Sequence, residues 1–228
     1  NCSDFCRKSS HSDEVNQTQI IVIGAGHAGC EAALTAARSG IETLLFTINL
    51  DTVAAMPCNP SIGGQGKGNL VREIDALGGE MGIVADETNI QARLLNTRKG
   101  LAVQSIRVQS DKYLYSRRML SSLLACPNLH LIQAQVAELI TAGGRAAGVR
   151  TAAGEEFKAK AIVVAPGTFL RGMIHIGNTQ FPAGRAGEPP SESLGISIER
   201  LGIPIMRFKT GTPPRVETNS IDFSGLEE

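Results

Sequence analysis

The feature that most constrains the fold is a glycine-rich turn between an apolar run and a helix-forming segment. The run 19–23 (QIIVI) is uninterrupted, as expected for a parallel strand buried on both faces. The glycines of the sequence G-A-G-H-A-G that follows have separate tasks. Gly24 permits a tight turn, Gly26 lets the backbone approach a pyrophosphate, and Gly29 allows the helix to pack closely on the strand. The pattern predicts binding of a dinucleotide diphosphate at the helix N-terminus; the alternative is a turn that needs glycines for geometry alone.

The remaining segments predict an α/β order with a meander. After the glycine turn a helix is expected, ended by Gly40, and then a second strand completes a βαβ unit. Ser110 is the expected N-cap of a later helix. The expected helices are 27–39, 69–77, 110–125 and 191–201; the expected strands are 19–23, 41–47, 161–165 and 203–208; a functional loop is expected over 49–68 and a β-meander over 129–157.

One element of the dinucleotide pattern is missing. An acidic residue usually follows the glycines by about 20 residues and binds the ribose, but the second strand ends at Phe46-Thr47 and the first acid is Asp51. Two alternatives for binding the ribose stay open: Thr47 forms a hydrogen bond in place of the acid, or the loop brings Asp51 back toward the ribose.

The late strand bears on which dinucleotide is bound. Residues 160–168 (KAIVVAPGT) read as a buried strand that ends in Gly-Thr after the meander. This order resembles flavoproteins with two dinucleotide-binding domains, in which the late strand runs beside the cofactor. It favours FAD over NAD, whereas an ordinary core strand is the alternative for the segment taken alone.

The loop 56–68 (MPCNPSIGGQGKG) contains a cysteine among glycines and amide side chains. Such a loop suits close backbone approach to a flavin. Cys58 acts as a nucleophile or proton carrier if a neighbour such as Lys67 or a helix N-terminus lowers its pKa; a buried, inert thiol is equally compatible with the local chemistry. The segment is not a P-loop, because Gly68 stands where that motif needs Ser or Thr.

Charge is balanced overall but not locally. Lys plus Arg and Asp plus Glu both total 22. Between residues 91 and 118 only Asp111 is acidic, and that stretch either neutralises phosphates or forms a solvated face balanced elsewhere. Its basic residues are Arg93, Arg98, Lys99, Arg107, Lys112, Arg117 and Arg118.

Composition excludes several classes of protein. No apolar tract is long enough to span a membrane, and mean hydropathy is zero. The five cysteines are few and widely spaced, which argues against a disulfide scaffold or a paired metal site and favours a reducing cytoplasm. The opening residues lack the apolar core of a secretory signal. We expect residues 1–17 to be a disordered tail, 18–205 an FAD-binding domain, and 206–228 the start of a second, truncated domain.

Several long motifs together resemble the GidA/MnmG family of FAD-dependent tRNA-modifying enzymes. They extend from about Thr18 to the end of the chain, and none of them lies in the tail. The motifs are GAGHAGCEAA, CNPSIGGQGKG, EIDALGGEMG, GTFLRGMIHIG, GRAGEPPS and KTGTPPR. The fold implied is α/β: a Rossmann-like FAD-binding domain with a parallel central sheet and a small β-meander, of the two-dinucleotide-binding-domain flavoprotein type.

The resemblance also implies a function and its residues. Flavin contacts would fall on Gly24, Ala25, Gly26, His27, Ala28 and Gly29, on Val136 and on Ser191, and Cys58 would be a catalytic thiol. Family members use FAD, NADH and methylene-tetrahydrofolate to add an aminomethyl-type group, such as carboxymethylaminomethyl, at C5 of wobble uridine 34 in tRNA. They are homodimers that work with the MnmE-type GTPase. A small-molecule FAD-dependent oxidoreductase of the same fold is the alternative, because fold does not fix function.

Overall fold

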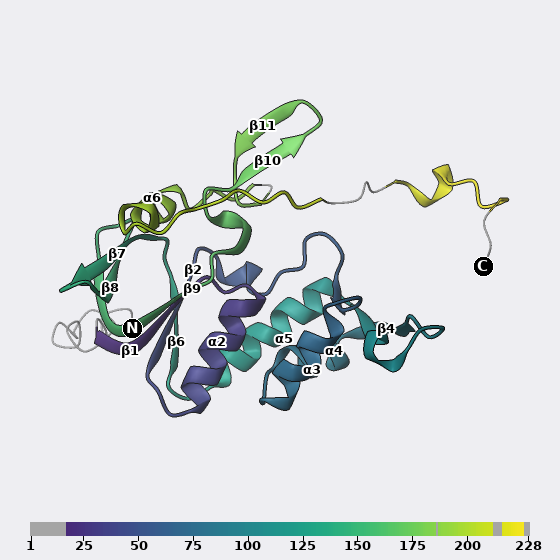
Figure 1. Cartoon of the computed structure of the whole chain (residues 1–228), viewed down its shortest axis with the longest axis horizontal. Coiled ribbons are helices and arrows are strands. Elements are labelled where there is room, and N and C mark those ends of the chain that lie inside the picture. The colour runs from purple at the N-terminus through teal and green to yellow at the C-terminus, as the bar shows by residue number, and fades with distance from the viewer. Residues whose placement is uncertain (1–16, 186, 212–215, 226–228) are drawn as a thin grey trace, which may run out of the picture.

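The computed structural model describes residues 17–185, 187–211 and 216–225. A six-stranded sheet in the order β6-β2-β1-β9-β8-β7 forms its centre (Figure 1). The first four strands in that order are parallel, and the last two join antiparallel. In chain order the strands are β1 (Gln17–Ile23), β2 (Thr43–Thr47), β6 (Leu129–Gln133), β7 (Val136–Ala142), β8 (Arg145–Thr151) and β9 (Glu156–Val164).

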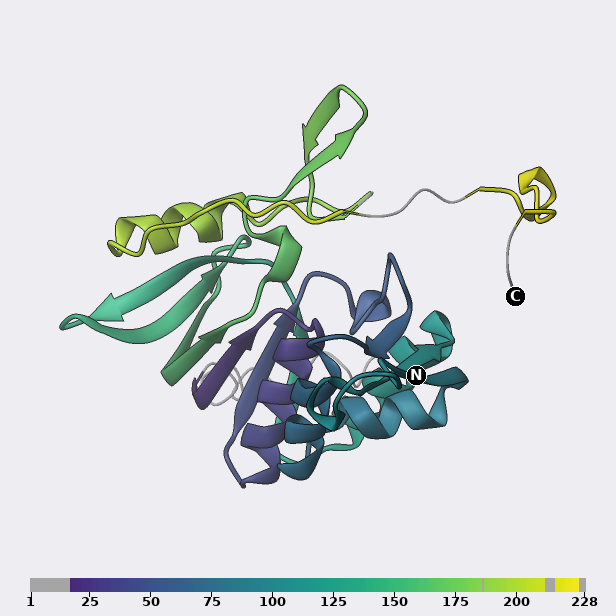
Figure 2. The same cartoon turned by 45° about the vertical axis from the view of Figure 1, so that its right-hand side comes forward.

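Both faces of β1 are covered, which explains its uninterrupted apolar sequence. Val22 packs in one core cluster with residues of α2 (His27–Arg38) and α5 (Lys112–Ala125). Ile21 and Ile23 pack in a second cluster on the other face, with residues of the meander, which consists of β7, β8 and β9, and of α6 (Glu192–Arg200). Helices α2 and α5 therefore cover one face of the parallel strands, and α6 lies on the other face, where the β7-β8 end of the sheet also packs (Figure 2).

A second, three-stranded sheet lies between β2 and α5 in the sequence. Its strands are ordered β3-β5-β4 and pair antiparallel. The helices beside it are short, and the carboxylate of Glu31 on α2 accepts hydrogen bonds from the amides of Glu80 and Met81 at the start of α4. The elements of this lobe are β3 (Ser61–Gly63), α3 (Gly68–Ala76), α4 (Met81–Glu87), β4 (Asn89–Leu95) and β5 (Ser105–Ser110).

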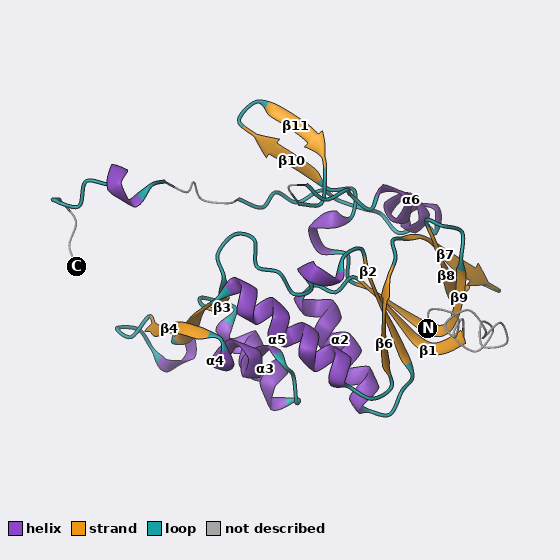
Figure 3. Ribbon diagram, turned by 180° about the vertical axis from the view of Figure 1, so that it is seen from behind, coloured by secondary structure: helices purple, strands orange, loops and turns teal. Residues whose placement is uncertain are grey.

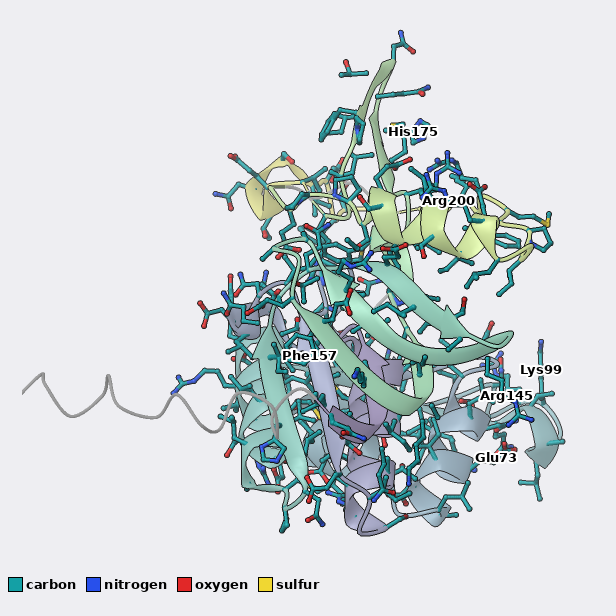
Figure 4. All side chains as sticks on the ribbon, turned by 90° about the vertical axis from the view of Figure 1, so that its left-hand side faces the viewer. Glu73, Lys99, Arg145, Phe157, His175 and Arg200 are labelled. Atoms are coloured by element: carbon teal, nitrogen blue, oxygen red, sulfur yellow. The ribbon has the colours of Figure 1, made fainter. Side chains whose placement is uncertain are left out.

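A hairpin of β10 (Met173–Ile176) and β11 (Thr179–Pro182) projects from the molecule, and the C-terminal segment extends away from it (Figure 3). Figure 4 places His175 on this hairpin. The single 3-10 turns are Leu50–Thr52, Gly167–Phe169, Leu101–Val103 and Thr218–Ser220.

The structure corrects several predicted elements. The N-cap of α5 is Asp111, not Ser110, because the Asp111 carboxylate accepts from the amides of Tyr113 and Leu114. The predicted meander was too long at its start, since β6 pairs parallel with β2. Residues 203–208 form no strand. Most of the predicted tail, residues 1–16, lies outside the described residues, whereas Gln17 begins β1.

Candidate functional site

A cavity of about 270 Å³ opens where β1, β2 and β9 end. Parallel strands place their carboxyl ends at one edge, and open α/β sheets bind ligands outside that edge. The lining is mainly apolar and backbone, with glycines and alanines that let a ligand approach the main chain. The cavity therefore has the position expected of a dinucleotide site.

The three motif glycines differ in what surrounds them. Gly24 has a φ of 99°, and its amide donates to the Phe46 carbonyl at 2.8 Å. A Cβ on Gly29 would overlap the Gly24 carbonyl oxygen, so this glycine sets the close packing of α2 on β1. A Cβ on Gly26 would meet nothing within 4 Å, because Gly26 faces the open cavity. The division of tasks expected from the sequence is confirmed for the turn and for the packing.

The structure separates the residues expected to contact the cofactor into three groups. Gly24, Ala25, Gly26, Val136 and Ser191 line the cavity together. Gly29 is buried on the face of α2 that packs against β1, and Ala28 is exposed on α2; neither lines the cavity. His27 lines a neighbouring pocket instead. The reason is rotation about the helix axis, which turns successive side chains of the first turn in different directions.

Hydrogen bonds between residues far apart in the sequence position Val136 and Ser191 at the cavity. The amide of Ser191 donates to the Phe169 carbonyl at 2.7 Å, and Ser191 occupies the N-cap position of α6. The Gln135 side chain, next to Val136, donates to the Pro190 carbonyl at 3.2 Å. These bonds hold the meander against the loop before α6.

Polar residues, but no acid, line the cavity at the end of β2. Thr47 and Asn49 line the cavity, and the Thr47 hydroxyl donates to the Asn49 carbonyl at 3.2 Å. Asp51 lies on a 3-10 turn and does not line the cavity. Thr47 is thus the better placed of the two residues considered from sequence.

An ion pair in the cavity wall was not singled out from the sequence. Arg185 and Glu188 both line the cavity and lie 2.8 Å apart between Nε and a carboxylate oxygen. The Arg185 guanidinium also stacks over the Phe169 ring, 5.1 Å from its centroid. Their signal was present in the motif GRAGEPPS, but nothing local indicated that the loop folds over the end of β9.

Cys58 lies in a second, more open pocket of about 420 Å³. Ala55 and Pro57 line both pockets, so the segment 55–57 is a shared wall between them. The amide of Ala54 donates to the Ala25 carbonyl at 2.8 Å, which fastens this segment to the glycine turn. Cys58 and the glycine cavity are therefore neighbours on opposite sides of one loop.

His27 shares the Cys58 pocket, with its ring 5.6 Å from that of Tyr115. Burial lowers the pKa of His27 below its usual 6.5, so the imidazole is neutral at physiological pH. Its Nε2 has no hydrogen-bond partner among the described residues. A neutral imidazole has one donor and one acceptor, and here one of them is unused.

The described cysteines differ in accessibility. Cys58 is exposed, whereas Cys30 is fully buried on α2. Burial raises the pKa of the Cys30 thiol to about 12, which keeps it protonated. Chemistry that needs an accessible thiol thus falls to Cys58 rather than Cys30.

Two other kinds of feature are absent from the part of the chain that the structure describes. These residues hold no group of three or more His, Cys, Asp or Glu side chains that could bind a metal ion. Among the same residues, no helix is both long and apolar enough to cross a membrane.

Curated relatives carry one name over nearly the whole chain. "tRNA uridine 5-carboxymethylaminomethyl modification enzyme MnmG" of Geobacter sulfurreducens is 54% identical over 215 residues, covering 94% of this chain and 34% of the relative. The protein of the same name from Thermodesulfovibrio yellowstonii is 54% identical over 209 residues, covering 92% and 34%. The chain thus spans about a third of the length of these relatives.

Solved structures agree with these relatives. GidA from Aquifex aeolicus superposes with a TM-score of 0.88 at 52% identity, covering 93% of this chain and 35% of that chain. A GidA-related protein from Thermus thermophilus, at 24% identity, superposes with a TM-score of 0.60 over 81% of this chain and 68% of its own and supports the fold alone. The predicted Rossmann-like α/β fold is confirmed. Because the family model described as "Glucose inhibited division protein A" matches residues 19–228, this chain belongs to the GidA family.

Proposed function

We propose that this chain is the FAD-binding part of an enzyme that modifies C5 of wobble uridine 34 in tRNA. The observation that carries the proposal is the glycine-lined cavity at the strand ends, separated by one loop from an exposed cysteine. Membership of the GidA family and the tRNA-modification name of its relatives supply the substrate class. The product proposed is a carboxymethylaminomethyl or related aminomethyl group.

The residues present fit FAD. Gly24, Ala25 and Gly26 would hold the diphosphate, where the free amides at the start of α2 favour an anion. Thr47 would contact the ribose, while Val136 and Ser191 would border other parts of the cofactor. His27 lines the neighbouring pocket, Gly29 allows α2 to pack closely on β1, and Ala28 is exposed on α2. Bound FAD would supply the redox and one-carbon chemistry.

The protein itself would contribute a thiol beside the bound cofactor. Cys58 is the proposed catalytic residue, because it is exposed and lies across the 55–57 wall from the cavity. A base lifted out of an RNA loop can reach such a pocket from solvent. The neutral imidazole of His27 in the same pocket can donate or accept one hydrogen bond there.

The wider system belongs to the same proposal. NADH would serve as reductant and methylene-tetrahydrofolate as the carbon donor. The whole protein would act as a homodimer in the cytoplasm, with tRNA as substrate and an MnmE-type GTPase as partner. We also propose that residues 18–205 form the FAD-binding domain and that a second domain begins at about residue 206.

Two measurements test the proposal. The purified chain should show the absorbance of bound flavin, and Cys58→Ser should retain that spectrum. Depletion of the full-length parent should remove the wobble-uridine modification, measured by nucleoside mass spectrometry, and the Cys58→Ser parent should not restore it. Cys126→Ser is the matched control, since Cys126 lies at the end of α5 and lines neither pocket. Unchanged modification after depletion would contradict the proposal, and full rescue by Cys58→Ser would remove the catalytic role.

A further inference from the structure

Basic residues gather around the three-stranded sheet, although the net charge of the whole chain is zero. Segments 52–72 and 89–110 contain no acidic residue. In the fold they come together, because β3 of the first segment pairs with β5 of the second. The acids of this lobe lie on α3, on α4 and at the N-cap of α4 instead; of these, Glu80 is paired with Arg38 and Glu87 with Arg118. The basic residues of the two segments are Lys67, Arg72, Arg93, Arg98, Lys99 and Arg107.

Strand register places two of these arginines side by side. Arg93 on β4 is the direct partner of Arg107 on β5, and Gly63 on β3 completes the row. No salt bridge joins either arginine to a carboxylate within the described residues, and the hydrogen bond found for the Arg107 guanidinium goes to the Gln109 side chain at 3.3 Å. Like charges directly opposite each other destabilise a sheet, so this row costs stability unless an anion binds it.

The arginines lie on the polar face of the sheet. The next row consists of Ser61, Gln109 and Gln91, whose side chains share that face because alternate residues of a strand point the same way. The opposite face carries Ile62 and Val108, both buried in the core. The arginine face therefore points away from the core of the molecule.

The basic surface extends beyond Arg93 and Arg107, over an area wider than one small anion would cover. Arg98 and Lys99 are exposed in the connection between β4 and β5, and Figure 4 shows Lys99 pointing away from the ribbon at the margin of the molecule. This connection is held by hydrogen bonds from Asn96 to the Val103 carbonyl at 2.9 Å and from Gln104 to the Lys99 carbonyl at 3.0 Å. An ordered row of separated cations fits a polyanion better than a single phosphate.

The strands also lack any aromatic residue. Proteins that read unpaired bases commonly stack them on aromatic side chains, whereas arginines bind phosphate through paired N–H groups. The ligand chemistry that fits is therefore the RNA backbone. All three residues of strand β3, Ser61, Ile62 and Gly63, line the Cys58 pocket, so the sheet borders that pocket along its β3 edge.

We propose that the polar face of the β3-β5-β4 sheet binds the phosphate backbone of the substrate RNA through the adjacent Arg93 and Arg107. This inference rests on the proposed function and names the surface that would direct the RNA toward Cys58. The contact neutralises phosphates and does not read sequence.

Fluorescence polarisation tests the site with the flavin-loaded chain and a labelled anticodon stem-loop RNA over a series of KCl concentrations. Arg93→Gln and Arg107→Gln should each weaken binding by about tenfold. The double variant should reduce the slope of log affinity against log salt by about 1 to 2, because two phosphate contacts are lost. A hairpin of scrambled sequence should show the same losses.

Arg145→Gln is the matched control, since Arg145 is exposed at the turn of the β7–β8 hairpin, at the other end of the molecule from β4 (Figure 1). Relief of like-charge repulsion should leave the melting temperature of Arg93→Gln unchanged or higher, which a merely structural arginine would not do. Arg107→Lys retains charge without the paired geometry and should bind with intermediate affinity, which covers the case of a poorly folded Arg107→Gln.

The outcomes separate this inference from the proposed function. Wild-type affinity and salt slope in a folded double variant would overturn the inference alone. The inference also fails if that variant loses only the binding of inorganic phosphate or a folate while RNA binding stays intact. A wild-type chain that binds no RNA would count against both.

Discussion

Replacement of Gly26 by alanine distinguishes the role of the glycine turn in binding FAD from its role in the packing of the fold. The backbone of Gly26 has φ −75° and ψ −176°, an extended conformation open to any residue. Its added Cβ meets nothing within 4 Å, whereas that of Gly29 overlaps the Gly24 carbonyl. The two substitutions add the same methyl group three residues apart, so they form a matched pair.

The two substitutions should affect different properties: Gly26→Ala the affinity for FAD, and Gly29→Ala the stability of the fold. For Gly26→Ala, reduced freedom of the unfolded chain contributes about 0.4–1 kcal/mol of stability. The loss of glycine at the N-cap costs a similar amount, so the apo melting temperature should move by less than about 2 °C. The methyl group projects into the cavity and should displace a diphosphate hydrogen bond of about 1.5–3 kcal/mol, which weakens FAD binding by about 10-fold to 150-fold. Gly29→Ala overpacks against rigid backbone at about 3 kcal/mol or more, which lowers the melting temperature by about 6 °C or more.

The assay is thermal unfolding of the apo chain together with titration of FAD by fluorescence quenching. Gly26→Ala should leave the melting temperature of the apo chain nearly unchanged and weaken the binding of FAD. Gly29→Ala should lower the melting temperature before any ligand is added. Equal FAD affinity for wild type and Gly26→Ala would refute the claim that the diphosphate binds against the backbone of Gly26. A large loss of apo stability in Gly26→Ala would refute the claim that its Cβ points into open space.

Three further predictions concern stability and thiol reactivity. Burial alone would raise the pKa of Glu80, but hydrogen bonds from Ser122 and Arg38 outweigh the effect of burial and hold the pKa below 4.5. The carboxylate therefore stabilises the fold above about pH 4.5 and loses this effect as the pH falls through the lowered pKa, so Glu80→Gln should cost about 1–3 kcal/mol at pH 7 and little at acid pH in urea titrations. Asp111→Ala should cost about 1 kcal/mol in the same titrations, whereas Ser110→Ala should cost less, because the Ser110 hydroxyl has no hydrogen-bond partner among the described residues. Iodoacetamide at pH 8 should label Cys58 and spare Cys30 in the folded chain, as checked by peptide mass spectrometry; equal labelling would contradict the burial of Cys30.

The elements that were predicted well have local signals. Strand β1 and helix α2 begin or end within two residues of the expected bounds, since an apolar run, a glycine turn and the Gly40 stop are read from neighbouring residues. Helix α6 was also expected within one residue at each end. Local sterics and helix-stop chemistry act over a few residues, so sequence alone carries them.

The elements that were missed depend on distant partners. Strand β4 is exposed on both faces over most of its length, so it shows no alternation of apolar and polar residues. Residues 203–208 have an apolar content that suggested a strand, but a strand needs a neighbour to pair with, and these residues have none in the described structure. Strand β6 was predicted as part of the meander, because its parallel pairing with β2 spans more than 80 residues and leaves no local signal.

By itself the sequence determined the glycine turn, the buried strand before it and the family motifs. Only the tertiary structure decided which of those residues face the cavity, that one loop divides it from Cys58, and that Arg185 and Glu188 close one wall. Only strand register could set Arg93 against Arg107. The physical reason is that backbone conformation follows from local sterics, whereas register and pocket walls follow from hydrogen bonds and packing between segments far apart in the chain.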